Sequence, residues 1–301
     1  MIRTRRQFLP HLRICDTFDA NVLANAILGT LASSAMLDKL KERGFELQFE
    51  SHAASILERD FPVALTDIER TLLSFEVPIA EIIGSGGGET KGTQRLRKAL
   101  ADLGWPFKIY EIKKTINGVP RESISHEIDH VKAFKGEWEG TKDIALEIEW
   151  NNKDPFFDRD LENFKRLHVE GAISVGIVIT RGTSLQKGMR DLVTRYAREQ
   201  GINSFDDLTR LGIGLTHPQR ADLERRIKRT KDFGESWASV FVASKFGEAT
   251  THWRKLMDRV SRGVGSPCPL LLVGFPGEIV TFRATAETGE PEPVAIEEPT
   301  P

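Results

Sequence analysis

The segment from Ile144 to Trp150, which reads I-A-L-E-I-E-W, carries two carboxylates two residues apart in an otherwise apolar run. Because side chains alternate between the two faces of a β-strand, Glu147 and Glu149 should project together from one face. Paired anions repel, and their burial is costly unless a cation or hydrogen-bond donors compensate the charge. A divalent metal ion is the commonest compensator. The spacing alone slightly favours the alternative, a strand at a sheet edge with its polar face in water.

A third acid comes from the strand before, in the sequence Glu127-Ile-Asp-His130. If residues 123–134 and 143–150 pair as an antiparallel hairpin centred near Trp138, Asp129 lies opposite Glu147. Cross-strand neighbours lie about 4.5–5.5 Å apart at their Cβ atoms, close enough for both carboxylates to bind one metal ion. The convergence of three acids moves the prediction from a polar edge strand towards a metal site.

The elements that must position these acids follow from the apolar patterns. The order along the chain is helices, then antiparallel strands, then helices alternating with two fully buried strands, which predicts an α/β fold with a central mixed β-sheet flanked by helices on both faces. A glycine-rich turn is expected at Gly84–Gly88. The predicted helices are 18–58, 63–77, 93–103, 158–168, 185–200, 218–231 and 254–261, and the predicted strands are 107–114, 123–134, 143–150, 172–180 and 269–275.

The length and composition suit a folded protein with a sizeable core. The chain has 301 residues, a hydrophobic fraction of 40% and a charged fraction of 29%. We expect a single domain over residues 1–283, with a helical N-terminal part at 1–80 and the catalytic core at 81–283. Residues 284–301 form an acidic, proline-rich tail that we expect to be disordered.

The net charge of −2 argues against a protein that coats nucleic acid non-specifically, but it permits a DNA enzyme with a local basic cleft. No apolar run reaches the roughly 20 residues of a membrane span, so no membrane partner is expected. The two cysteines lie far apart and form no metal-binding pattern, which favours a reducing, cytoplasmic location.

The acids on successive strands resemble the pattern of the PD-(D/E)xK nucleases, in which an Asp and a Glu on neighbouring strands hold Mg²⁺. The third residue of that pattern is usually Lys; here it is Glu149, which gives an E-x-E variant, and Ile128 replaces the Pro. Three longer strings resemble type II restriction endonucleases of the BglII/BstYI family. They are residues 150–168 (W-N-N-K-D-P-F-F-D-R-D-L-E-N-F-K-R-L-H), 174–182 and 250–274.

This resemblance implies a restriction-endonuclease-like fold and a homodimer that binds a short palindrome in double-stranded DNA, typically GATC-centred. It also implies cleavage of both strands with Mg²⁺, for which Mn²⁺ should substitute. A cognate DNA methyltransferase is expected in the same system, though not in physical complex with this chain.

Phosphodiester hydrolysis explains why these residue types are present. It needs an activated water and neutralisation of the charge that develops on the phosphate and the leaving oxygen. A metal ion held by Asp129, Glu147 and the backbone carbonyl of Ile148 could serve both needs. Glu149 would orient or deprotonate the water, provided that it lies within hydrogen-bond reach.

Further candidates surround this centre. Glu89 has two interpretations. It is either an accessory acid of the metal site or an acid favoured by the dipole of the helix it opens, and the sequence slightly favours the second. Lys153 either contacts a phosphate or is a solvated lysine. For each remaining candidate, an ordinary surface role is the alternative to groove or backbone contact. The DNA-binding candidates are Asn151, Asn152, Arg181, Ser184, Gln186, Lys187, Thr251 and His252.

Two other functions compete with a sequence-specific endonuclease. One is a structure-specific PD-(D/E)xK nuclease in DNA repair or defence. The other is a DNA-binding protein that has kept the fold and lost catalysis, against which the intact set of Asp129, Glu147 and Glu149 argues.

Overall fold

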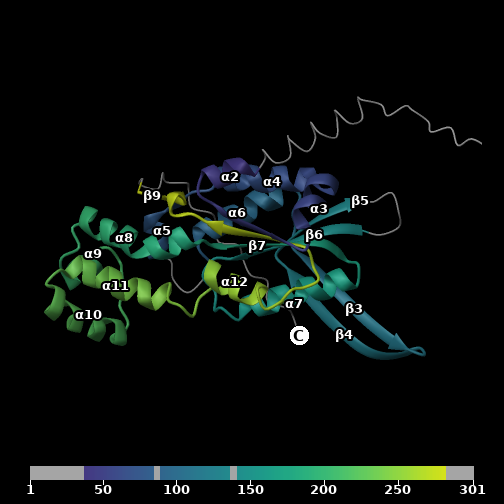
Figure 1. Ribbon diagram of the computed structural model, residues 1–301. Helices are drawn as coiled ribbons and strands as arrows, with labels where there is room; N and C mark the ends of the chain where they lie inside the picture. The colour runs from purple at the N-terminus through teal and green to yellow at the C-terminus, as the bar shows by residue number, and fades with distance from the viewer. Residues whose placement is uncertain (1–36, 85–88, 136–140, 283–301) are drawn as a thin grey trace, which may run out of the picture.

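A five-stranded mixed sheet forms the centre of the molecule (Figure 1). The computed structural model describes residues 37–84, 89–135 and 141–282. The strand order is β1-β8-β7-β6-β5; β6, β7 and β8 run parallel, and the outer strands β1 and β5 are antiparallel to their neighbours. The predicted α/β class with a mixed sheet is confirmed. The strands are β1 (Glu46–Glu50), β5 (His130–Lys135), β6 (Thr141–Glu149), β7 (Ile173–Arg181) and β8 (Leu270–Phe275).

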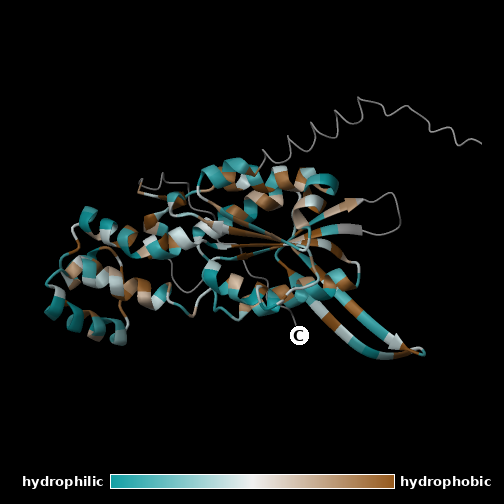
Figure 2. Cartoon of the chain, in the orientation of Figure 1, coloured by the Kyte–Doolittle hydropathy of each residue, from teal (hydrophilic) through white to brown (hydrophobic). Residues whose placement is uncertain are grey.

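The three inner strands are apolar because both faces of the sheet are covered. Ile144, Leu146 and Ile148 of β6 belong to one apolar core, whereas Ala145 and the neighbouring strand's Val178 belong to a second core on the opposite face. Figure 2 shows these strands as the most hydrophobic part of the chain. Burial on both faces is what a parallel sheet between helix layers requires.

Helices lie on both faces of the sheet (Figure 1). The second core is covered by α7 (Phe156–Val169) and α12 (Trp253–Val260), and the first by a larger group of helices. That group is α2 (Asp38–Glu42), α3 (Ala53–Asp60), α4 (Pro62–Leu73), α5 (Ile79–Gly84), α6 (Lys91–Asp102) and α8 (Thr183–Glu199).

Beyond α8, three helices form an extension at one end of the molecule: α9 (Phe205–Arg210), α10 (His217–Thr230) and α11 (Phe233–Lys245). Helix α11 packs on α8 and α10 packs on α11. A short parallel pair, β2 (Val77–Pro78) and β9 (Val280–Thr281), and the 3-10 helix η1 (Gly277–Ile279) complete the described elements.

A two-stranded hairpin projects from the body at the other end (Figure 1). It consists of β3 (Lys108–Ile116) and β4 (Val119–Ile128). Its turn is Asn117-Gly118, both with positive φ (51° and 77°), which is the backbone that tight hairpins favour. The turn was predicted, but the predicted strand 123–134 is interrupted at Asp129: β4 belongs to the projecting hairpin and β5 to the central sheet.

The predicted helix over 18–58 is correct at α2 and at the start of α3, but it is not continuous in its described part. Gly44, with φ of 87°, ends the short helix α2, and residues 46–50 then form β1 against β8. Helices α5, α9 and α11 were not predicted. The glycine-rich turn beyond Gly84 and the tail at 284–301 lie outside the described residues. In the described part of the chain, no helix combines the length and apolarity that a membrane crossing needs.

Candidate active site

The hairpin of β5 and β6 has the register that the sequence predicts. His130 pairs with Leu146 and Val131 with Ala145 in an antiparallel ladder. The ladder ends one pair short of the predicted partners, so that Asp129 lies at the bend just before β5, next to Glu147. The charge of Asp129 contributes to the shifted pKa of Glu147, as expected for neighbouring carboxyl groups.

Glu147 and Glu149 lie on the α7 side of the sheet and are almost inaccessible to water. Their exposed fractions are 3% and 2%, and β6 has β5 on one side and β7 on the other. The edge strand with a solvated polar face, the alternative that the sequence left open, is therefore wrong. Ile148 lies between the two acids, paired with Ile179 of β7 and beyond the last residue of β6 that pairs with β5.

Asp160 of α7 is a further buried acid at the same place, and the sequence analysis missed it. It has no solvent-exposed surface. Arg159 donates to its Oδ1 from Nε (2.8 Å), and its carboxylate also shares a hydrogen bond with the carboxyl group of Glu149. A signal was available in the sequence: Phe157 and Phe164 lie three and four residues from Asp160 and Leu161 follows it directly, which places a carboxylate inside the apolar stripe of a helix.

Burial is the largest cause that raises the pKa of each of the three buried acids, Glu147, Glu149 and Asp160. Burial raises the pKa of Glu147 well above its usual value, and the charges of Asp160, Asp129 and Glu149 add to the shift. Burial, followed by the charge of Asp160, raises the pKa of Glu149 to about 9. Asn152 opposes this shift, because its Nδ2 donates to Oε2 of Glu149 over 2.8 Å. The site therefore lacks the positive charge that would allow these carboxyl groups to ionise at neutral pH.

Two arginines are the cations nearest to these acids. Arg97 of α6 donates to Oδ1 of Asp129 from Nη2 (2.5 Å) and to Oε1 of Glu89 from Nη1 (3.0 Å). Glu89 is thus linked to Asp129 through Arg97, and both interpretations of Glu89, accessory acid and acid favoured by the helix dipole, stay open. Arg159 lies with Nη2 3.9 Å from Oε1 of Glu149.

Carboxylate oxygens are suitable ligands for Mg²⁺. Among the described residues, however, no group of three His, Cys, Asp or Glu side chains is arranged so that it could hold a metal ion. The available donors are carboxylate oxygens, which hard divalent cations prefer. Glu147 and Glu149 are almost fully buried, and the charge of Arg159 only partly offsets the rise that burial causes in their pKa values. A cation in this place would neutralise groups that are now buried without sufficient compensation.

Several predicted DNA-contacting residues form a buried clamp beside the site. Arg181 has no exposed surface and donates to the carbonyl oxygens of Trp150 (2.8 Å) and Thr251 (2.7 Å) and to the side chain of Gln186. Thr251 in turn bonds to the backbone of Asn152. These contacts hold the loop after β6 against residues 249–251. Of the other candidates, Asn152, Lys153, Ser184 and Lys187 are exposed, Asn151 is half-buried and His252 is buried.

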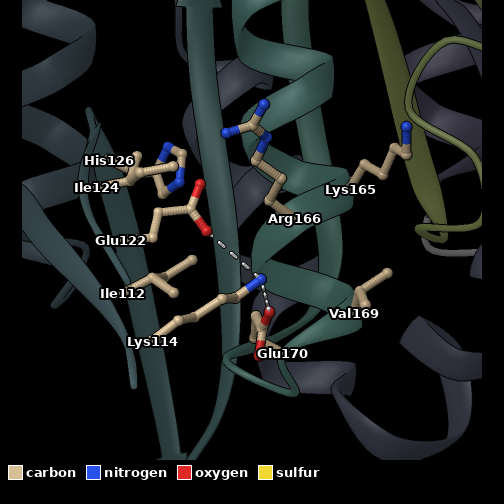
Figure 3. Close-up of a pocket in the computed structure, with 9 residues that line it drawn as sticks. All are labelled: Ile112, Lys114, Glu122, Ile124, His126, Lys165, Arg166, Val169 and Glu170. Atoms are coloured by element: carbon tan, nitrogen blue, oxygen red, sulfur yellow. Dashed lines mark ion pairs between the residues drawn. The ribbon is translucent and has the colours of Figure 1, made fainter. Parts of the chain in front are cut away.

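A separate pocket of about 240 Å³ lies between the β3–β4 hairpin and α7 (Figure 3). Lys114 crosses it, with Nζ 3.0 Å from Glu170 and 3.9 Å from Glu122. None of the predicted catalytic acids lines this pocket. It is therefore distinct from the acid cluster on β6.

Comparison with known proteins places this site in a family. The model of a protein family described as restriction endonuclease BglII/BglIII matches residues 45–275, which include every strand of the central sheet. No curated protein matches the chain. Because the matched region covers well over half of the chain and contains all the acids described above, the protein belongs to the BglII/BglIII family of restriction endonucleases.

Proposed function

We propose that the chain is a Mg²⁺-dependent type II endonuclease that hydrolyses both strands of double-stranded DNA at a short palindrome. The observation that carries the proposal is the buried pair Glu147 and Glu149 with Asp129 at the adjacent bend, within a restriction endonuclease family. A GATC-centred palindrome is the first recognition site to test, and a homodimer is the assembly that places one such site on each strand. A cognate methyltransferase would protect the same sequence in the host.

The acids divide the chemistry between them. Asp129, Glu147 and the carbonyl of Ile148 would hold the metal ion, which supplies charge neutralisation at the phosphate and acidifies a bound water. Glu149 would accept a proton from the attacking water. Burial raises the pKa of Glu149 to about 9, so without a cation this group would hold its own proton; the positive charge of the metal ion would favour the ionised form, which is the form that accepts a proton.

The neighbouring residues hold these groups in place. Asn152 fixes one oxygen of Glu149 and is itself anchored by Thr251 through its backbone amide. Lys153 follows Asn152 in the loop after β6, is exposed, and is available to a DNA phosphate. Mn²⁺ should replace Mg²⁺, since both accept oxygen ligands.

The first experiment is digestion of a plasmid of known sequence with Mg²⁺, followed by sequencing of the fragment ends. Discrete fragments with one common end sequence support the proposal. A smear or simple nicking favours the structure-specific nuclease, and DNA binding without cleavage in Mg²⁺ and Mn²⁺ favours a protein that has lost catalysis.

Substitution of Glu147 tests whether this carboxylate is needed for cleavage. Glu147→Ala should abolish cleavage and leave DNA binding in Ca²⁺ largely intact, because the lost carboxylate acts on the metal ion and repels the phosphates. Glu162→Gln is the matched control, since Glu162 also lies on α7 but is only half-buried and is paired with Lys165 and Arg166. Full activity of Glu147→Ala would refute the assignment.

A further inference from the structure

Helix α10 carries a cluster of positive charge that the packing of the fold does not use. Residues 217–231, which form α10 and its C-cap, contain six arginines and lysines against two acids, although the whole chain has a net charge of −2. Leu223 is buried, and Ile227, one turn further on, packs against the same core. The helix thus meets the rest of the molecule along one side, where it packs on α11, and Figure 2 shows much of it as hydrophilic.

The basic residues lie on the other side of α10. At about 3.6 residues per turn, Arg225, Lys228 and Arg229 fall on the face away from α11, and all three are exposed. We call these three residues the basic face of α10. Lys228 and Arg229 have no ion pair in the described part of the chain, and Arg225 has an exposed one with Asp222, with Nη2 2.8 Å from Oδ1. An exposed pair of this kind contributes little and can exchange for another anion.

The physics of an isolated helix explains only part of this cluster. The helix dipole favours cations in the last turn, but Arg225 lies before that turn. Like charges three or four residues apart repel one another and weaken a helix. Helix α6 shows the contrast, because its cations Arg95, Arg97 and Lys98 each pair with a carboxylate. The basic face of α10 is instead open to an anionic partner from outside the chain.

The N-terminal end of α10 lies where the extension leads back to the acids. Nε2 of Gln219 donates to Oγ of Ser244 over 2.9 Å, which ties the first turn of α10 to the end of α11. Beyond α11 the chain reaches residues 250–251, which bond to the loop after β6 beside Glu149. From Gln219, α10 continues for about 18 Å to Lys231, at about 1.5 Å per residue. A duplex rises about 3.4 Å per base pair, so the helix has the length of about five base pairs.

We propose that the basic face of α10 binds the phosphate backbone of DNA base pairs that flank the cleavage site. The inference rests on the proposed function, because it assigns a second contact surface to the same DNA. A row of cations along a helix is complementary to the regular charge of a duplex. Since phosphates carry no sequence information, this contact strengthens binding and its salt dependence but does not select the site.

The direct test is the triple variant Arg225→Gln, Lys228→Gln and Arg229→Gln, in which glutamine keeps the preference for a helix. Its affinity for a duplex of about 40 base pairs is measured by fluorescence anisotropy in Ca²⁺ at several salt concentrations. The loss of three phosphate contacts should lower the affinity about tenfold or more, and should reduce the slope of log affinity against log salt by about two to three. An unchanged slope, whether or not the affinity changes, overturns the proposal and would leave this face to an acidic protein.

The matched control removes three charges from the opposite side of the sheet. Lys39→Gln, Lys41→Gln and Arg59→Gln change exposed residues of α2 and α3, which cover the face away from Glu147 and Glu149. The affinity of this variant should stay within about twofold of the wild type, with the same salt slope. Equal losses in the two triple variants would mean that total charge, and not α10, sets the affinity, and would overturn the proposal.

The wild type offers a second measurement that does not depend on the folding of a variant. Lengthening the DNA on each side of the cleavage sequence from about two to about ten base pairs should raise the affinity several-fold, and no gain overturns the proposal. The two proposals fail differently. If the wild type binds DNA through α10 but cuts none, the proposed nuclease activity fails and the contact with DNA stands. If the wild type cuts DNA while the triple variant binds it equally well, the basic face of α10 alone is excluded.

Discussion

Glu149→Gln should stabilise the metal-free protein at alkaline pH. The side chain is 2% exposed, and its carboxyl group has a pKa raised from 4.5 to about 9, first by burial and then by the charge of Asp160. The amide removes the ionisable group, still accepts a bond from Asn152, and can donate towards Asp160. A protein that lacks this group escapes the cost of keeping it buried.

The magnitude follows from proton linkage. Below pH 4.5 both the folded and the unfolded protein hold the proton, and the group costs nothing. As the pH rises from 4.5 towards 9, the unfolded chain loses the proton while the folded chain keeps it, so stability falls by about 1.36 kcal/mol per pH unit. Between pH 5 and pH 8 the wild type should therefore lose about 4 kcal/mol relative to Glu149→Gln.

The assay is urea unfolding of both proteins in EDTA at pH 5 and pH 8. The stability difference should be small at pH 5 and favour Glu149→Gln at pH 8. Glu162→Gln serves as the control, because this half-buried, ion-paired glutamate should change stability by less than about 1 kcal/mol at either pH. If the difference between Glu149→Gln and the wild type changes by less than about 1 kcal/mol between the two pH values, the electrostatic reasoning for the site is wrong.

Three other perturbations test neighbouring features. Gly176→Ala should lower the free energy of unfolding by about 1–3 kcal/mol in urea, because a Cβ there would meet a phenylalanine ring of α7. Gly188→Ala has open space around it in α8 and should raise the free energy of unfolding by about 0.5–1 kcal/mol. Equal effects of the two substitutions would contradict the packing. Arg181→Met should cost about 2–4 kcal/mol in the same assay, because it leaves buried carbonyl groups without donors, and a neutral result would mean that the clamp is dispensable. Arg97→Ala should raise Ca²⁺ affinity several-fold in calorimetry without DNA, since the guanidinium then no longer holds Asp129; unchanged affinity would show that the pair does not compete with metal.

The sequence predicted the register of the β5–β6 hairpin because the expected turn places the hairpin centre near Trp138, and the observed pairs His130–Leu146 and Val131–Ala145 have that same centre. The buried strands β7 and β8 were equally clear from their continuous apolar runs. In contrast, β1 was taken for helix, since a five-residue strand owes its existence to pairing with β8 and not to its own pattern.

Two residues of the site, Asp160 and Arg97, were not predicted, because their position also depends on contacts between distant elements. Asp160 and Arg97 come from helices, and nothing in local spacing tells which turn of a helix faces a given strand. The charge of Asp160 within an apolar stripe was the one local signal. The predicted DNA contacts at Arg181 and Thr251 show that residue type alone does not identify a DNA contact. Both residue types suit DNA, but here their hydrogen-bonding groups bond to other residues inside the protein.

The pairing of β1 with β8 joins residue 46 to residue 274 across nearly the whole chain. At a synthesis rate of roughly 5–20 residues per second, a ribosome needs roughly 10–45 s to make the intervening segment. Throughout that time β1 has no partner, and β7, once it has been made, presents an open edge to other chains until β8 follows. Completion of the sheet therefore waits for the last strand, and a chain that stops before residue 270 would be prone to aggregation even though it already contains every acid of the candidate site.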